Sequence, residues 1–376
     1  MLRDRANNGR IYGTGLKGCI GKMSETKRLR YYDLLRIISF LMVTFYHMMV
    51  QLQVVGVCTA EEVTPFFLTK NIHIATLAVS VFFMLSGAGL TIRAEKSLSL
   101  KEYYKSRFLR LLVPFYITTV LFYIANLIVR HRMPVEFDQK IHPAKYIFTL
   151  LGMDEWIRMH QIPTFSTSIG EWFLGVLIIL SILFPLFYFF MKRWPKIFLA
   201  LCMAAYIYLI YNYRSSVVIQ ASLPIKGFEF ILGMYLGKYY KKIPSKWVIL
   251  AVPVTVFFFT SSVTLNINIA LVTTISALAF FAAFSGLEPL LQKPKKDILK
   301  FLGAYTYPFF LVHHIIIYEL TERFVPYYNG IGSVLLLFLI EIALMVVACI
   351  AVKKLTDLVL WLISLPGKKK KKEKKE

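Results

Sequence analysis

The chain has 376 residues, of which 57% are hydrophobic and only 17% are charged. Soluble domains contain about 45–50% apolar and about 25% charged residues, so this composition argues against a disordered chain, a disulfide scaffold and a soluble nucleic-acid-binding protein. The 44 Lys and Arg exceed the 21 Asp and Glu, but they stand in short clusters between long apolar runs. That pattern is typical of a polytopic membrane protein, and we expect no nucleic-acid partner.

The N-terminal residues 1–26 are predicted to be a lead segment outside the folded domain. Residues 1–22 are polar, Gly-rich and basic, and they lack the apolar core of a signal peptide. Met23 then begins a stretch that resembles a natural start. We therefore expect residues 1–26 to be disordered or mis-assigned and to carry no function.

Ten apolar segments approach the length of about 20 residues that a membrane-spanning helix needs. They cover residues 33–53, 72–92, 110–129, 170–191, 196–213, 223–240, 247–264, 267–287, 300–321 and 330–352. The predicted fold is therefore all-α, with one membrane domain over residues 27–352 that has about ten transmembrane helices. A basic tail follows over residues 353–376.

The orientation follows from the distribution of Lys and Arg on alternate sides of these spans. The side that holds both termini receives 34 basic residues and the opposite side receives 8, while Arg36 and Lys226 lie inside spans. Positively charged loops stay on the cytoplasmic side. We therefore expect cytoplasmic termini, an even number of spans and a multi-pass location in a plasma membrane.

The first span carries Asp33, Arg36 and His47, although a charged group inside a span costs at least about 2.5–3.5 kcal/mol. At 100° per residue the three share one helix face, and Arg36 and His47 are about 16 Å apart along the axis. Asp33 can pair with Arg36 near the cytoplasmic surface. His47 lies beyond the membrane centre, where it is either a structural hydrogen-bonding partner or a general base for a hydroxyl.

Two motifs mark the cytoplasmic ends of the second and third spans. The second span ends in Ser86-Gly87-Ala88-Gly89, whose small residues favour close helix packing. Lys105, Arg107 and Arg110 precede the third span. Arg107 and Arg110 are three residues apart, a spacing that suits bidentate contacts with phosphate. The alternative is that they only anchor the cytoplasmic end of the span, as the positive-inside rule describes.

Further polar residues stand in the later spans. Glu171 and Trp172 begin the fourth span, Glu229 follows Lys226 by three residues in the sixth, and Glu341 lies in the tenth. Each carboxylate at membrane depth calls for a partner or a function.

The ninth span contains Pro308, which is expected to kink the helix, and the adjacent residues His313 and His314. Adjacent residues point about 100° apart on a helix, so these two histidines are not expected to ligate one metal ion. We predict no metal site.

Five of these segments, in this order, resemble the motifs of the acyltransferase-3 family of integral-membrane enzymes that O-acylate bacterial surface glycans. They are Arg36 followed after ten residues by His47, then residues 82–87, 105–114, 171–174 and 309–313. Each motif alone is weak evidence for the family, whereas five motifs in this order on a ten-span plan are specific for it. The resemblance covers residues 27 to about 352.

The resemblance implies transfer of a short acyl group, usually acetyl, from acetyl-CoA or another short acyl-CoA in the cytoplasm to a hydroxyl of an extracytoplasmic carbohydrate. It implies that His47 is essential and that Arg36 accompanies it. It also implies that Arg107 and Arg110, with Lys105, engage the CoA. No metal cofactor is expected.

We hypothesise that His47 deprotonates the acceptor hydroxyl while Arg36 or Ser86 steadies the developing oxyanion. Asp33 is expected to assist as the partner of Arg36. An acyl-histidine intermediate is the alternative. The residues expected to contact the acceptor are Glu171, Trp172, Glu229, His313 and Glu341.

Two other functions remain open from the residues alone. A transporter or flippase for a glycan or lipid-linked sugar would move its substrate without consuming acyl-CoA. Another type of membrane O-acyltransferase would use His313 or His314 as its base and would not need His47. The expected partners are membrane lipids, a cell-surface glycan and glycan-biosynthesis proteins in a bacterial plasma membrane.

Overall fold

The computed structural model describes residues 29–130, 142–164, 169–215, 217–239, 245–261, 263, 265–292 and 297–364. The predicted N-terminal lead, residues 1–26, lies outside these described residues, as do residues 365–376 of the predicted tail.

Ten main helices in the described part of the chain coincide with the ten predicted spans. They are α2 (Arg30–Val54), α4 (Ile74–Ala94), α5 (Leu100–Arg130), α8 (Glu171–Arg193), α9 (Pro195–Asn212), α10 (Leu223–Tyr239), α11 (Ser245–Thr260), α12 (Ile269–Ser285), α15 (Thr306–Phe324) and α16 (Ile331–Ser364). Short helices connect them: α3 (Ala60–Phe67), α6 (Tyr146–Leu150), α7 (Asp154–Met159), α13 (Glu288–Leu291) and α14 (Ile298–Gly303). The only β-structure within the described ranges is an isolated bridge between Leu68 and His73.

Six of these helices, α2, α4, α5, α8, α9 and α16, are long and apolar enough to cross a membrane. The all-α membrane fold is therefore confirmed, while the number of crossings and the side of each terminus stay predictions. Large apolar side chains point outward on the peripheral helices, such as Leu201 on α9, Ile249 on α11 and Leu339 on α16. Helices with this surface suit contact with lipid, because their backbone hydrogen bonds are satisfied internally.

Three helix boundaries differ from the prediction. Helix α5 begins at Leu100, so residues 105–110 lie on the helix itself, and α16 continues through residues 353–364 of the predicted tail. An ion pair between Lys353 and Asp357 stabilises that extension, one turn apart at 2.7 Å. The ninth span is divided into α14 and α15 at Ala304 and Tyr305 and is not kinked at Pro308. Pro308 lies in the first turn of α15, where its missing N–H would have no helical partner.

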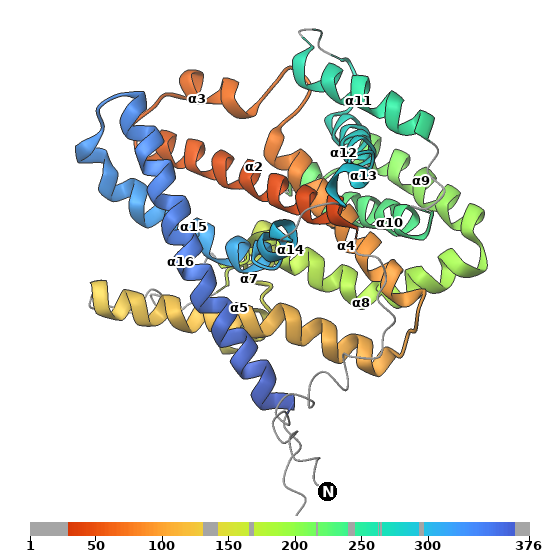
Figure 1. Ribbon diagram of the computed structural model, residues 1–376, viewed down its shortest axis with the longest axis horizontal. Coiled ribbons are helices and arrows are strands. Elements are labelled where there is room, and N and C mark those ends of the chain that lie inside the picture. The colour runs from red at the N-terminus through yellow and green to blue at the C-terminus, as the bar shows by residue number, and fades with distance from the viewer. Residues whose placement is uncertain are drawn as a thin grey trace, which may run out of the picture.

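Helices α2 and α4 lie side by side in the middle of the bundle (Figure 1). Helix α4 also packs on α10, α12 and α8, whereas the opposite side of α2 contacts α15 and α14. Helix α16 packs along α15 and crosses α5 obliquely (Figure 1). The largest apolar core fills the space between α4, α5, α8 and α10 around Phe83, Phe184 and Phe230.

Glycine residues bring α4 and α10 into backbone contact. A Cβ on Gly233 of α10 would lie 2.5 Å from the Met84 Cα, and one on Gly237 would lie 2.7 Å from the Ala88 Cα. In the opposite direction, a Cβ on Gly87 of α4 would overlap the backbone of Phe230. The small residues predicted to favour close packing therefore do so, and they fix the position of α4 against α10.

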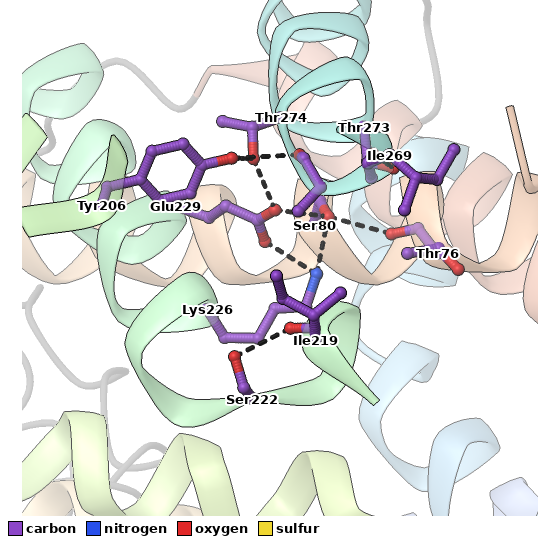
Figure 2. A network of polar contacts seen from close by, with 11 residues as sticks. Thr76, Ser80, Tyr206, Ile219, Ser222, Lys226, Glu229, Ile269, Thr273 and Thr274 are labelled. Atoms are coloured by element: carbon purple, nitrogen blue, oxygen red, sulfur yellow. Dashed lines mark hydrogen bonds and ion pairs between the residues drawn. The ribbon is translucent and has the colours of Figure 1, made fainter. Parts of the chain in front are cut away.

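A fully buried ion pair lies beside this glycine contact (Figure 2). Lys226 Nζ of α10 donates to Glu229 Oε2 at 3.0 Å and to Ser80 Oγ of α4 at 2.9 Å. Ser80 and Thr274 of α12 donate to Glu229 Oε1 at 2.9 and 3.0 Å. Tyr206 of α9 donates to Thr274 at 2.9 Å, so one polar network links four helices.

We expect Gly233→Leu to weaken the α4–α10 contact by about 1–3 kcal/mol or more, because backbone atoms of Met84 cannot rotate away from the new side chain. The measurement is the melting temperature of the purified protein in detergent. Gly332→Leu on α16 is the matched control, since nothing lies within 4 Å of a Cβ at that position. Equal melting temperatures for the two variants would contradict the packing role.

We expect Lys226→Met to destabilise the protein by about 3–5 kcal/mol, because it leaves the Glu229 carboxylate buried without its cation. The double variant Lys226→Met with Glu229→Leu removes both charges and should be more stable than Lys226→Met alone. Thermal unfolding of the single and double variants measures this coupling. Additive losses would show that the pair does not act as a unit.

Candidate active site

Three imidazoles converge where α2 meets α15. The ring centroid of His47 lies 4.0 Å from that of His314 and 5.4 Å from that of His313, and the two α15 rings are 4.8 Å apart. Ring nitrogen atoms of all three lie within 4.8 Å of one another. His313 and His314 are buried, whereas His47 is only half-buried. We call His47, His313 and His314 the histidine cluster.

The convergence of His313 and His314 differs from the sequence-based expectation. Their adjacency predicted side chains that point apart, yet both rings reach the same point beside His47 because α2 packs against the α15 face between them. Three imidazole nitrogens are a donor set that suits a borderline divalent metal ion. The geometric reason for expecting no metal site therefore does not hold.

A backbone hydrogen bond orients His313. Its Nδ1 lies 2.7 Å from the carbonyl oxygen of Phe310, and a carbonyl only accepts, so Nδ1 carries the proton. In the neutral ring, Nε2 then holds the lone pair. The edge-on ring of Phe40 on α2 supports the same imidazole, with centroids 6.1 Å apart.

Aromatic residues that sequence analysis missed surround the histidine cluster. Tyr46 lies between His47 and His73, with ring centroids 5.0 and 4.6 Å away, and Tyr318 lies 4.9 Å from His314. His73 precedes α4 and its ring accepts from the Thr76 N–H. Burial lowers the pKa of His73 below its usual value, which favours the neutral ring. The sequence feature that could have drawn attention to His73 is its position at the start of the predicted span over residues 72–92.

A second polar centre forms around Arg107 on α5. Its Nη2 donates to Ser86 Oγ of α4 at 3.0 Å, and its Nε donates to Ser181 Oγ of α8 at 2.9 Å. Arg110 follows about one turn later on α5, and Arg36 of α2 lies beside Gly89, one turn from Ser86 on α4. We call Arg36, Arg107 and Arg110 the arginine cluster.

One proline and two tyrosine hydroxyls help to place Arg107. Pro185 in α8 has no N–H for the carbonyl of Ser181, and the hydroxyl of Tyr103 donates to that carbonyl at 2.7 Å. On the other side of Arg107, the Leu111 carbonyl of α5 accepts from the hydroxyl of Tyr307 on α15 at 2.7 Å. These bonds join α5 to α8 and to α15 on either side of the guanidinium.

Arg36 is turned toward Asp33. Its Nη1 lies 3.0 Å from Asp33 Oδ1, and the carboxylate is buried. A Cβ on Gly303 would come within 2.8 Å of the same oxygen, so α14 closes over Asp33. On the other side, Arg36 Nη2 lies 3.8 Å from the position of a Cβ on Gly89 of α4. The predicted pair therefore forms, and it is part of the arginine cluster.

The two clusters occupy different depths of the bundle. Arg36 and His47 are about 16 Å apart along α2, and Tyr307 precedes His313 by about 9 Å along α15. Ser86 lies about 20 Å along α4 from His73, which flanks the histidine cluster through Tyr46. The structure thus brings Arg36 and Ser86 together with Arg107, and not beside His47 as hypothesised.

Aromatic rings connect the two clusters. The ring centroids of Tyr307 and Phe310 are 6.4 Å apart, and Phe310 lies 4.8 Å from Phe173 of α8 and 5.7 Å from His313. A chain of packed aromatic rings therefore lies between the two clusters.

Among the residues expected to contact the acceptor whose side chains the structure describes, only His313 lies in the histidine cluster. The side chain of Glu171 lies outside the described part of the structure. Trp172 stacks near Phe83 in the apolar core, with ring centroids 6.4 Å apart, and Glu229 is engaged in the buried network. Glu341 is buried on α16 and accepts from Thr321, two turns beyond His314 on α15.

The remaining cationic residues predicted to bind CoA face outward. Lys105 and Arg110 are exposed on α5, on the same helix as half-buried Arg107. Their charges are therefore not enclosed by the bundle.

Comparison with known proteins identifies the family. The acyltransferase-3 family model, described as an acyltransferase domain, matches residues 29–353. No curated protein and no solved structure matches the chain at a significant level. The match spans most of the chain and includes both clusters, so the chain belongs to the acyltransferase-3 family and is a membrane acyltransferase.

Proposed function

We propose that this protein transfers an acyl group, acetyl in the first instance, from cytoplasmic acyl-CoA to a hydroxyl of an extracytoplasmic carbohydrate. The observation that carries the proposal is the pairing of an arginine cluster with a half-buried histidine at a different depth of one helical bundle. The acyl-CoA donor has an anionic head, which suits the arginine cluster. The carbohydrate acceptor has a neutral hydroxyl, which suits the histidine.

The arginine cluster is the proposed donor end. CoA carries phosphate groups, and guanidinium groups bind phosphate through paired charge-assisted hydrogen bonds. Two serine hydroxyls orient Arg107, while Arg110 and Lys105 offer exposed positive charge. Arg36, held by Asp33, completes the anion site. In this proposal Ser86 positions Arg107 and takes no direct part in the chemistry.

The histidine cluster is the proposed acceptor end. His47 takes the proton of the acceptor hydroxyl, and the oxygen attacks the thioester carbonyl. The C–S bond then breaks, the ester forms, and the proton passes from His47 to the CoA thiolate. An acyl-histidine intermediate is the alternative order of steps. His313 and His314 stand close enough to hold the reacting imidazole in place.

The setting proposed for this reaction is a bacterial plasma membrane with both termini in the cytoplasm. The excess of 34 over 8 basic residues on the terminal side supports this orientation. It directs the arginine cluster toward the CoA pool and the histidine cluster toward the outer surface. Membrane lipids, a cell-surface glycan and glycan-biosynthesis proteins are the proposed partners.

We expect cells that express the protein to carry envelope glycans heavier by one acyl group per modified sugar, as measured by mass spectrometry. His47→Ala should lower transfer by about 10²–10⁴-fold, the usual contribution of a general base. His160→Ala is the matched control, since His160 is an exposed histidine on the C-terminal side of α7. Transport of a glycan without acyl-CoA consumption would instead support a transporter.

We expect Arg110→Gln and Arg107→Gln to raise the KM for acyl-CoA about tenfold or more while kcat changes less, since a hydrogen bond to a charged group contributes about 1.5–3 kcal/mol. Steady-state kinetics with acetyl-CoA measure this. Arg193→Gln is the control, because Arg193 is an exposed basic residue at the C-terminal end of α8. An unchanged KM in both test variants would contradict the donor site.

A further inference from the structure

We propose that the histidine cluster is a binding site for a divalent metal ion of the zinc class, and that a bound ion inhibits acyl transfer. The first part concerns His47, His313 and His314 alone. The second part rests on the proposed function, because it assumes that His47 acts on the acceptor hydroxyl.

The spacing of the three imidazoles suits one shared ion. Their ring nitrogens lie within 4.8 Å of one another, so one point lies no more than about 2.8 Å from all three. Zinc–imidazole bonds are about 2.0–2.1 Å long. Each nitrogen must therefore move by only about 0.7 Å, which small side-chain rotations supply without a shift of α2 or α15.

The hydrogen bond of His313 prepares one ligand atom. Histidines that ligate a metal usually donate their second ring N–H to a carbonyl or carboxylate, which fixes the ring and leaves the other nitrogen for the ion. The contact from His313 Nδ1 to the Phe310 carbonyl is of this kind. It leaves Nε2 as the ligand atom.

The partial exposure of His47 leaves one coordination position of a bound ion open. His313 and His314 are buried, but His47 is half-buried, so a fourth ligand such as water can approach from its side. Three protein nitrogens with one open position differ from closed structural zinc sites and match sites that take water as a fourth ligand. The absence of carboxylate and carbonyl oxygens from this donor set disfavours Mg²⁺ and Ca²⁺ and favours Zn²⁺, Co²⁺, Ni²⁺ or Cu²⁺.

Metal binding and proton transfer need the same lone pair. A nitrogen of His47 that ligates the ion cannot accept a proton from the acceptor hydroxyl. Occupancy should therefore convert the protein into an inactive form, and removal of the ion should restore it. Because the three ligands are neutral, the ion keeps its charge in a low-dielectric setting, which predicts weaker binding than at a closed thiolate site.

The binding experiment uses the full-length protein in detergent, purified without a polyhistidine tag and equilibrated with Zn²⁺ or Co²⁺. We expect one ion per chain by elemental analysis, and visible Co²⁺ absorption of the intensity typical of four-coordinate sites. His313→Gln and His314→Gln should each weaken binding by about tenfold or more, since losing even an outer partner of a ligand costs about 10–100-fold. His160→Ala should bind as the wild type does.

The melting temperature of each variant in the absence of metal identifies any that fail to fold, and the other glutamine variant then decides the result. Binding below one ion per two chains would overturn the proposal. Binding that both glutamine variants leave unchanged would do the same.

The activity experiment tests the inhibitory part separately. We expect Zn²⁺ to lower acyl transfer by the wild type and a chelator to restore it. Activity that disappears on chelation would overturn the inhibitory role, because the ion would then be required. If no acyl transfer occurs under any condition, the proposed function fails, whereas the stoichiometry and the glutamine variants still decide the metal site.

Discussion

The buried Lys226–Glu229 ion pair is the interaction on which the arrangement of the bundle depends. Two charges inside an apolar bundle are tolerated only when both are paired and hydrogen-bonded. Ser80 and Thr274 meet that requirement from two neighbouring helices, so the ion pair ties α10 to α4 and α12. The glycine contact then brings the α4 and α10 backbones together.

The fixed position of α4 determines both polar centres. At one end of this helix Ser86 accepts from Arg107, and at the other end His73 packs on Tyr46 beside His47. Pro185 leaves the Ser181 carbonyl free for the hydroxyl of Tyr103, and Tyr307 donates to the Leu111 carbonyl, so α5 is joined to α8 and α15 around Arg107. The separation of the arginine and histidine clusters therefore follows from how one central helix is held.

The two proposed uses of the histidine cluster, proton transfer and metal binding, exclude each other. With its lone pair available, His47 can take a proton from a hydroxyl, and His313 and His314 hold its surroundings. With a divalent ion bound, the same nitrogen is occupied. Under both proposals, acyl transfer would respond to the concentration of free zinc-class ions through His47.

The sequence by itself determined the all-α membrane class, the ten main helices and the pairing of Asp33 with Arg36, because apolar run length and i, i+3 spacing are local properties. The order of the motifs also predicted functional roles for His47 and Arg107, which stay predictions. Only the tertiary structure decided that His314 joins His47, that Ser86 and Arg36 belong with Arg107, and that Glu229 serves the buried network. These contacts join helices far apart in the chain, and their geometry depends on helix packing that no local pattern records.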